Sequence, residues 1–248
     1  MTRTARRRGA SDIYHVMARG VSRSSIFEDD ADRERFLGEL RRQVSDAGAS
    51  IYAWCLMDNH YHLLIRLELS SLSAMMKAVN SSYAVYFNSR HDRVGHLFQG
   101  RFKSEPVDTE EYFFVVLRYI HQNPVKEGMT RTCEYRWSSY GEYLGEKDLA
   151  ETELALGMFG SRQSFIDFHK TLDLTATCCD IDRARRLLSE EEARNVAAAV
   201  LGDIHLESIV GLERSARNDA IRKLRNAHLS VRQIERLTGV SRGIVARV

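Results

Sequence analysis

The chain has 248 residues, 44% of them hydrophobic, and a formal net charge of +2. This length suits one large domain, or one domain with a smaller module, and the apolar content suffices for a packed core. No apolar stretch is long enough to span a bilayer and the first residues lack the apolar core of a signal peptide, so we expect no membrane partner and a cytoplasmic location. The four cysteines form no Cys-x-x-Cys pair, which argues against structural zinc and is typical of a reducing compartment.

Charge is distributed unevenly along the chain. Four arginines make the N-terminal arm basic: Arg3, Arg6, Arg7 and Arg8. Residues 146–203 hold 12 Asp and Glu against 7 Lys and Arg, whereas residues 211–248 hold 3 against 9. We therefore expect a first domain over 1–145, a helical linking region over 146–210 and a basic terminal module over 211–248. Basic ends suit a polyanionic partner.

Hydrophobic periodicity predicts the elements of the first domain in chain order. They are a strand over 12–18, a helix over 32–47, a hairpin over 51–67, a helix over 69–89, a strand over 102–107 and a helix over 110–123. Hairpin strands that alternate with helices predict an α+β domain with an antiparallel sheet. Further helices are predicted over 161–170, 180–188 and 190–201.

Capping residues are predicted at several helix ends. Gly48 ends the first helix and Ser70 or Ser71 begins the second. Asp108-Thr109 begins the third, which Pro124 limits to about residue 123.

The hairpin carries two histidines in its second strand. Strand side chains alternate between faces, so His60 and His62 point the same way while Tyr61, Leu63 and Ile65 point into a core. Two imidazoles side by side form half of a divalent-metal site, because each offers a nitrogen lone pair. Alone, the pattern more often marks a half-buried structural pair.

The helix over 110–123 carries Tyr119 and Asn123 on one face, a turn apart. Each alone is a common structural residue. Together they suit phosphodiester chemistry, because a phenol can attack the phosphate and an amide oxygen can add a third ligand to Mg²⁺ or Mn²⁺. Arg101 and Lys103 are predicted to share a strand face that contacts a phosphate backbone, although a merely solvated face is the ordinary reading.

These residues carry a resemblance to a known family. Four blocks keep their order and spacing over residues 12–145, namely 14–20 (YHVMARG), 54–62 (WCLMDNHYH), 95–104 (GHLFQGRFKS) and 118–125 (RYIHQNPV), followed by Trp137-Ser138-Ser139-Tyr140. The chain resembles the IS200-like (Y1) transposases, and within them the branch associated with repetitive extragenic palindromes (REP). The resemblance implies a ferredoxin-like antiparallel sheet with helices on one face. It also implies an HUH endonuclease that cuts single-stranded DNA beside a hairpin, leaving a 5′-phosphotyrosine and a free 3′-hydroxyl.

Carried over by position, the resemblance implies His60 and His62 as metal ligands and Tyr119 as the nucleophile. Asn123 stands where other members of the wider family use Gln as third ligand, and its arm is one methylene shorter, so Gln122 stays the alternative. Hairpin DNA contacts are implied for residues before Gly20, with Arg19 among them, and for Arg101 and Lys103. Because the phosphotyrosine stores the bond energy, rejoining needs no nucleotide cofactor. The branch implies a monomer, whereas relatives elsewhere in the family form dimers.

The basic C-terminal module reads as a series of short helices. A helix with Ile221 and Leu224 is followed by one capped by Ser230 that ends at Gly239, and by one that Ser241 caps. Two short helices joined by a Gly turn resemble a helix-turn-helix, with Arg242 and Arg247 as DNA contacts. Glu235 departs from that motif, and a basic hairpin that only packs on the first domain is the alternative.

Three functions remain open on the sequence. The first is a metal-dependent enzyme that nicks and joins DNA, which requires His60, His62 and Tyr119 to converge. The second is a catalytically silent DNA-binding regulator built from the same two modules. The third, a metallohydrolase of small phosphoesters, would not need the basic C-terminal module.

Overall fold

The computed structural model of the chain describes residues 6–172, 178, 190–202, 204–227, 229 and 231–247. The chain divides into two compact units, Met1–Cys179 and Asp180–Val248, here called unit 1 and unit 2. None of the helices in the described ranges is long and apolar enough to cross a membrane. The predicted division into 1–145, 146–210 and 211–248 stays a prediction.

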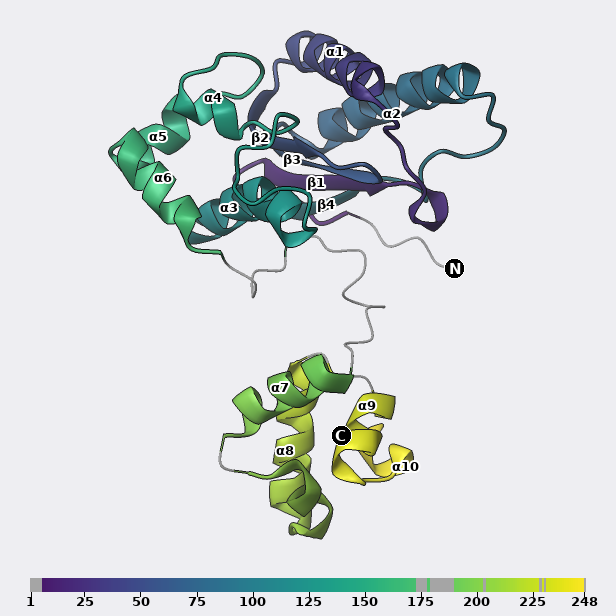
Figure 1. Cartoon of the computed structure of the whole chain (residues 1–248), viewed down its shortest axis with the longest axis vertical. Coiled ribbons are helices and arrows are strands. Elements are labelled where there is room, and N and C mark those ends of the chain that lie inside the picture. Colours follow the sequence, from purple (N-terminus) through teal and green to yellow (C-terminus); the bar gives the residue numbers. More distant parts are fainter. Residues whose placement is uncertain are drawn as a thin grey trace. The chain divides into compact units, whose positions relative to one another are not determined.

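Unit 1 is built on a four-stranded antiparallel sheet (Figure 1). Its strands are β1 (Ile13–Arg19), β2 (Ser50–Leu56), β3 (His60–Arg66) and β4 (Lys103–Pro106), in the spatial order β2-β3-β1-β4. With helix α1 between β1 and β2 and helix α2 between β3 and β4, this is the β-α-β-β-α-β arrangement of ferredoxin-like folds. The predicted α+β class and antiparallel sheet are confirmed.

Helices α1 (Asp30–Ala47) and α2 (Leu69–Arg90) cover one face of the sheet. Their apolar stripes pack on the strand residues that point to that face, including Val16 and Leu63. Asp29 caps α1 by accepting from the Asp32 N–H, and Gly48 ends it at a φ of 62°, as predicted for Gly48. The α2 prediction of a Ser70 or Ser71 cap is wrong. The Glu68 carboxylate accepts from the N–H groups of both serines, because it reaches two donors where a hydroxyl would reach one.

Helix α3 (Glu110–Lys126) lies on the opposite face of the sheet (Figure 1). The expectation of helices on one face therefore holds for α1 and α2 but not for α3. Thr109 caps α3 by accepting from the Tyr112 N–H, which confirms the predicted start. Pro124 does not limit the helix, which continues to Lys126. A proline in the last turn removes only one intrahelical hydrogen bond, so the turn survives.

The C-terminal part of unit 1 packs beside α3. It comprises α4 (Tyr140–Leu144), α5 (Glu153–Phe159) and α6 (Arg162–Lys170). The predicted helix over 161–170 is thus confirmed as α6. The Trp137–Ser139 segment runs along β2, with the Leu56 N–H donating to the Trp137 carbonyl and the Ser139 N–H to the Trp54 carbonyl.

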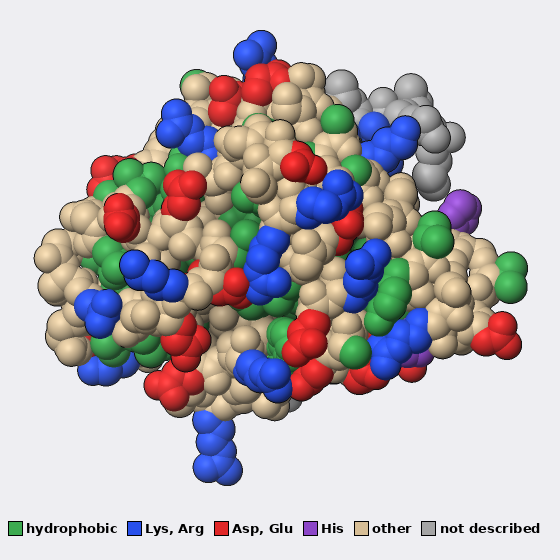
Figure 2. All heavy atoms as spheres, turned by 90° about the horizontal axis from the view of Figure 1, so that it is seen from above, with side chains coloured by type: hydrophobic (Ala, Val, Ile, Leu, Met, Phe, Trp, Pro, Cys, Tyr) green, Lys and Arg blue, Asp and Glu red, His purple; other side chains and the backbone are tan. Residues whose placement is uncertain are grey.

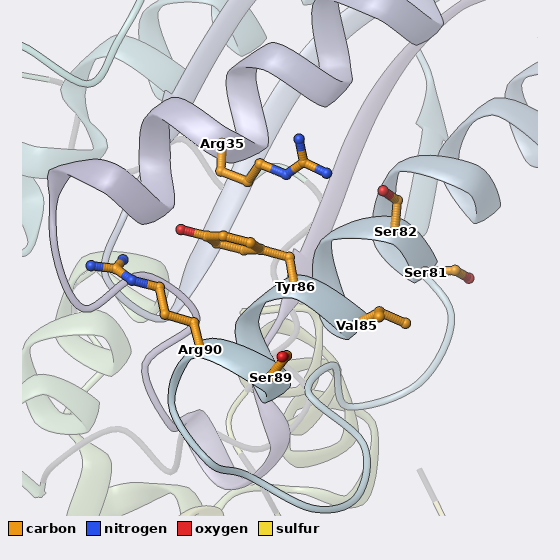
Figure 3. Close-up of a pocket in the computed structure, with 7 residues that line it drawn as sticks. All are labelled: Arg35, Ser81, Ser82, Val85, Tyr86, Ser89 and Arg90. Carbon is orange, nitrogen blue, oxygen red and sulfur yellow. The ribbon is translucent and has the colours of Figure 1, made fainter.

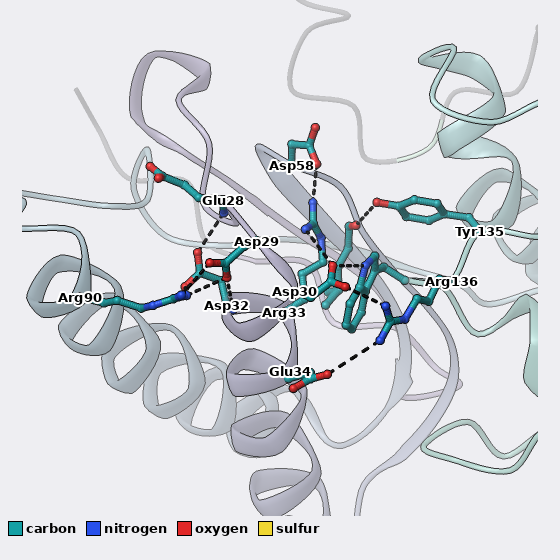
Figure 4. Close-up of polar contacts among 12 residues, drawn as sticks. Glu28, Asp29, Asp30, Asp32, Arg33, Glu34, Asp58, Arg90, Tyr135 and Arg136 are labelled. Atoms are coloured by element: carbon teal, nitrogen blue, oxygen red, sulfur yellow. Dashed lines mark hydrogen bonds and ion pairs between the residues drawn. The ribbon is translucent and has the colours of Figure 1, made fainter.

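Ion pairs tie the start of α1 to the hairpin turn that precedes β3 (Figure 4). Arg33 pairs with Asp58 of that turn, and Arg90 of α2 pairs with Asp29 and Asp32 at 2.6 Å each. The Asp58 carbonyl also accepts from the N–H groups of residues 26 and 27. Arg33 and the N–H groups of residues 26 and 27 thus all bind Asp58 and hold the turn from which β3 begins.

Unit 2 is all-helical within the residues described. Its elements are α7 (Glu190–Leu201), a 3₁₀ segment η2 (Leu206–Gly211), α8 (Arg214–Asn226), α9 (Val231–Thr238) and α10 (Arg242–Val245). The predicted helix over 190–201 is confirmed, and the one over 180–188 lies outside the described residues, as does the Ser230 cap. Gly239 joins α9 to α10 at a φ of 72°, a conformation that favours glycine.

Candidate active site

The two histidines of β3 begin the site. His60 and His62 point to the sheet face that α3 covers, and their ring centroids lie 5.0 Å apart at 90°. The His60 Nδ1 lies 2.6 Å from Oδ1 of its neighbour Asn59. His62 is 1% exposed, and its burial, followed by the nearby imidazoles and Lys126, lowers its pKa well below the ordinary value. The His62 ring is therefore suited to the neutral form that binds a metal.

A third imidazole comes from β1. In the antiparallel register Met17 faces His62 and Arg19 faces His60, so alternate β1 side chains share the histidine face. His15 is one of them, and its Nε2 lies 2.8 Å from His62 Nδ1. Burial lowers the pKa of His15 to about 3. His15 lies in the first block that resembles the family, but the sequence assigns it no role. Only the strand register shows that its side chain meets that of His62.

Tyr119 reaches the imidazoles from α3. Its ring centroid lies 5.5 Å from that of His62 and 5.8 Å from that of His15, edge-on to both. Its side chain is buried, with 9% of the residue exposed. The structure thus brings His60, His62 and Tyr119 together from two elements that are far apart in the sequence.

The α3 residues after Tyr119 complete its surroundings. Asn123, one turn further, is 5% exposed, while Lys126, two turns further, places its Nζ 4.6 Å from the Tyr119 ring centroid. Gln122 points elsewhere, because its amide donates to the carbonyls of His169 and Thr171 at the end of α6. Lys126 was missed because the helix was expected to end at Pro124.

The predicted DNA contacts of unit 1 fall in different places. Lys103 faces Met17 across the strand pair and is exposed at the edge strand β4, on the site face of the sheet. Arg101 does not share that face, because β4 begins only at Lys103 and Arg101 lies in the preceding bend. Arg19 is 8% exposed and donates to Gln99, which makes it part of the site wall.

The N-terminal arm adds one cation beside these residues. The Arg6 guanidinium lies 3.8 Å from the Phe102 ring centroid and donates to Ser73. Partial burial, and then the charge of Arg101, lowers the pKa of Arg6. Arg6 and Arg101 therefore lie near each other, just before β4 begins at Lys103.

The predicted contacts of unit 2 lie at the end of the chain. Arg242 at the start of α10 pairs with Glu235 of α9, and Arg247 donates to the Gly243 carbonyl at 2.7 Å. Glu235, the residue that departs from the helix-turn-helix pattern, is thus the ion-pair partner of Arg242. DNA binding by these two arginines stays a prediction.

A divalent cation at this face of the sheet would find few side-chain ligands. No group of three or more His, Cys, Asp or Glu suited to a metal occurs in the part of the chain that the structure describes. Two imidazoles and the Asn123 amide would thus supply the protein ligands, leaving positions for water and phosphate oxygens. That set fits Mn²⁺ or Mg²⁺, which commonly keep several non-protein oxygen ligands.

A groove of about 670 Å³ lies away from this site, over α1 and α2 (Figure 3). Its lining residues are Arg35, Ser81, Ser82, Val85, Tyr86, Ser89 and Arg90. Seen from above α1 and α2, unit 1 shows Lys and Arg intermingled with Asp and Glu (Figure 2). The sheet separates this mixed face from Tyr119, so the groove is not part of the candidate active site.

Fold and site together define a class of protein, namely an α+β domain whose antiparallel sheet presents two imidazoles to a tyrosine on a helix. Residues 11–123 match the family of IS200-like transposases, which confirms the resemblance drawn from the sequence and supports a DNA-processing function of the transposase type.

A solved structure of a REP-associated tyrosine transposase bound to a REP hairpin shares the fold, with 17% identity and a TM-score of 0.50. That similarity covers 59% of this chain and 87% of the other. A comparison with curated proteins finds no match.

Proposed function

We propose that the chain is a metal-dependent enzyme that cleaves and rejoins single-stranded DNA beside a hairpin. One observation carries the proposal: the Tyr119 ring lies 5.5 Å from His62, whose neighbour His60 is 5.0 Å further along the same face. A core tyrosine needs no imidazole pair beside it, whereas a tyrosine nucleophile is commonly activated by a neighbouring base or a bound metal, which the two imidazoles could supply. Hairpin DNA as the partner is supported by the REP hairpin in the similar solved structure.

In this mechanism the Tyr119 phenolic oxygen attacks the phosphorus of the scissile phosphodiester and releases its proton to solvent. The bond from phosphorus to the 3′-oxygen breaks, and the leaving oxygen takes up a proton. The products are a 5′-phosphotyrosine and a free 3′-hydroxyl, and the reverse reaction joins strands without a nucleotide cofactor. The positive charge of Lys126 beside the ring stabilises the charge that develops on the phenolic oxygen.

His60, His62 and Asn123 would hold Mg²⁺ or Mn²⁺ at this face of the sheet. When bound, the cation supplies Lewis-acid polarisation of the scissile phosphate. The chain's own contribution is to orient the Tyr119 ring against the buried His62, and to hold both His60 and His62 by hydrogen bonds before substrate arrives. Arg6, Arg101 and Lys103 are proposed to contact the DNA backbone from the start of β4.

The test is a covalent-adduct assay. The full chain is incubated with an end-labelled DNA hairpin carrying single-stranded flanks and with Mn²⁺ or Mg²⁺, and a denaturing gel separates free DNA from protein-linked DNA. We expect an adduct with the wild type and none with Tyr119→Phe, while hairpin affinity stays within about twofold. Tyr140→Phe is the matched control, because Tyr140 is also buried behind the sheet but contacts His121 rather than His62. An adduct of undiminished yield with Tyr119→Phe refutes the assignment.

A DNA-binding regulator without catalysis is the second candidate, and burial favours it. Tyr119 is 9% exposed and His62 1%, so substrate reaches them only after side chains move. The same gel separates the two functions, because the regulator predicts hairpin binding with no adduct under any metal. DNA binding by the C-terminal helices is compatible with either candidate, and so is a monomer.

A further inference from the structure

The two candidate ligands differ in what holds their second ring nitrogen. His60 Nδ1 lies 2.6 Å from the side-chain oxygen of Asn59, which only accepts hydrogen bonds, so His60 must donate from Nδ1. The lone pair of His60 is then carried by Nε2, the ring nitrogen through which it would bind a cation. His62 Nδ1 instead lies 2.8 Å from His15 Nε2, and either imidazole could be the donor of that bond.

The direction of the bond between the two imidazoles decides whether His62 can act as a ligand. If His62 Nδ1–H donates to the lone pair of His15 Nε2, the Nε2 of His62 keeps its own lone pair. If His15 Nε2–H donates, His62 carries its proton on Nε2 and that nitrogen cannot coordinate. Metal-binding histidines generally need a partner that accepts from the other ring nitrogen.

We infer that His15 is a positioning residue that orients His62 and holds it in the tautomer whose Nε2 lone pair is free. The inference rests on the proposed metal-dependent function. It makes His15, on β1, a part of the candidate active site.

His15 is fully buried, and His62 Nδ1 is the hydrogen-bond partner of its Nε2. The tautomer that accepts from His62 places the His15 proton on Nδ1, which has no hydrogen-bond partner among the described residues, so holding that tautomer carries a cost. The strand register places His15 opposite Leu64 and diagonal to His62, which keeps the two rings in reach. The His15 ring also contacts the Tyr119 ring, at 5.8 Å between centroids.

The experiment measures Mn²⁺ affinity of the full chain without DNA, by electron paramagnetic resonance titration. Loss of an outer partner of a ligating histidine typically weakens metal binding about 10–100-fold, and we expect a loss of that size for His15→Leu. His15→Gln restores an acceptor near the position of Nε2 and should recover most of the affinity. His15→Asn, one methylene shorter, should not.

A second buried imidazole pair supplies the matched control. His121 Nδ1 lies 3.1 Å from His169 Nε2, away from His60. His169→Leu removes a comparable bond and should leave Mn²⁺ affinity within about twofold. Thermal unfolding of every variant identifies those that fold, and if His15→Leu does not, the comparison of His15→Gln with His15→Asn decides.

Two outcomes are distinguishable. If wild type binds Mn²⁺ and His15→Leu or His15→Asn binds it equally well, the role of His15 is refuted while the proposed function stands. If wild type neither binds Mn²⁺ nor forms the adduct with any metal, the proposed function fails, and the inference fails with it.

Discussion

Gly20, the residue after β1, offers a sharp test of how tightly the site is built. A Cβ added there would lie 2.1 Å from the Ser24 carbonyl oxygen and 3.0 Å from a methyl of Ile26. The Gly20 backbone has φ −63° and ψ 150°, which any residue adopts, so the cost of Gly20→Ala is steric rather than conformational. Because the nearest atom is backbone, relief requires the turn over 21–24 to shift.

The expected cost of Gly20→Ala is about 1–3 kcal/mol, the usual range for forcing extra volume into a packed site. Urea unfolding, followed with a probe in unit 1, measures it. Gly38→Ala is the control, because Gly38 is exposed within α1 and its Cβ would meet no atom within 4 Å. Alanine should stabilise that helix by about 0.5–1 kcal/mol.

The same variant should also affect the site. The Gly20 N–H donates to the Asn59 carbonyl at 2.9 Å, and the Asn59 side chain holds His60. A shift at residue 20 therefore reaches a candidate ligand, and Mn²⁺ affinity should fall in Gly20→Ala but not in Gly38→Ala. If Gly20→Ala is as stable as wild type, the close approach of this turn is not a real constraint and the reasoning is wrong.

Three further predictions concern α3 and α6. Lys126→Met should slow single-turnover adduct formation about tenfold, which corresponds to about 1.4 kcal/mol of lost transition-state stabilisation. Lys126→Arg keeps the charge beside Tyr119 and should react close to the wild-type rate. Equal rates for wild type and both variants would exclude a role for this charge. Thr109→Ala should cost about 1 kcal/mol in urea unfolding because it removes the acceptor of the Tyr112 N–H, and Thr109→Ser should cost less. Burial lowers the pKa of His169 to about 4, so its contribution to stability is complete above the unfolded pKa of 6.5 and is lost as pH falls towards 4. His169→Leu should flatten the decline in unfolding free energy over that interval, and an unchanged slope would show that His169 does not titrate on unfolding.

Much of the site could be predicted from the sequence because its residues follow the periods of their elements. The two-residue period of a strand put His60 and His62 on one face, and the helical period put Tyr119 and Asn123 on another. That the two faces meet depends on which side of the sheet α3 occupies. No local pattern encodes that choice, and the resemblance implied only that His60, His62 and Tyr119 act together, not which face α3 covers.

The residues that sequence reasoning missed depended on details at element ends or on strand pairing. Lys126 was excluded by treating Pro124 as a helix stop, although a last-turn proline costs only one hydrogen bond. His15 needed the β1–β3 register, and Arg101 lies outside the strand because β4 begins at Lys103, one residue after the predicted start at residue 102. Long-range pairing and exact boundaries are the features that short sequence windows specify least.

The order in which the site residues occur along the chain has a consequence for synthesis. β1 and β3 both precede α3, so a growing chain contains the imidazoles more than 50 residues before it contains Tyr119. The ribosome thus adds the proposed nucleophile last among the three elements. A polypeptide released anywhere between residues 62 and 119 would contain both histidines but lack Tyr119, and should therefore form no DNA adduct.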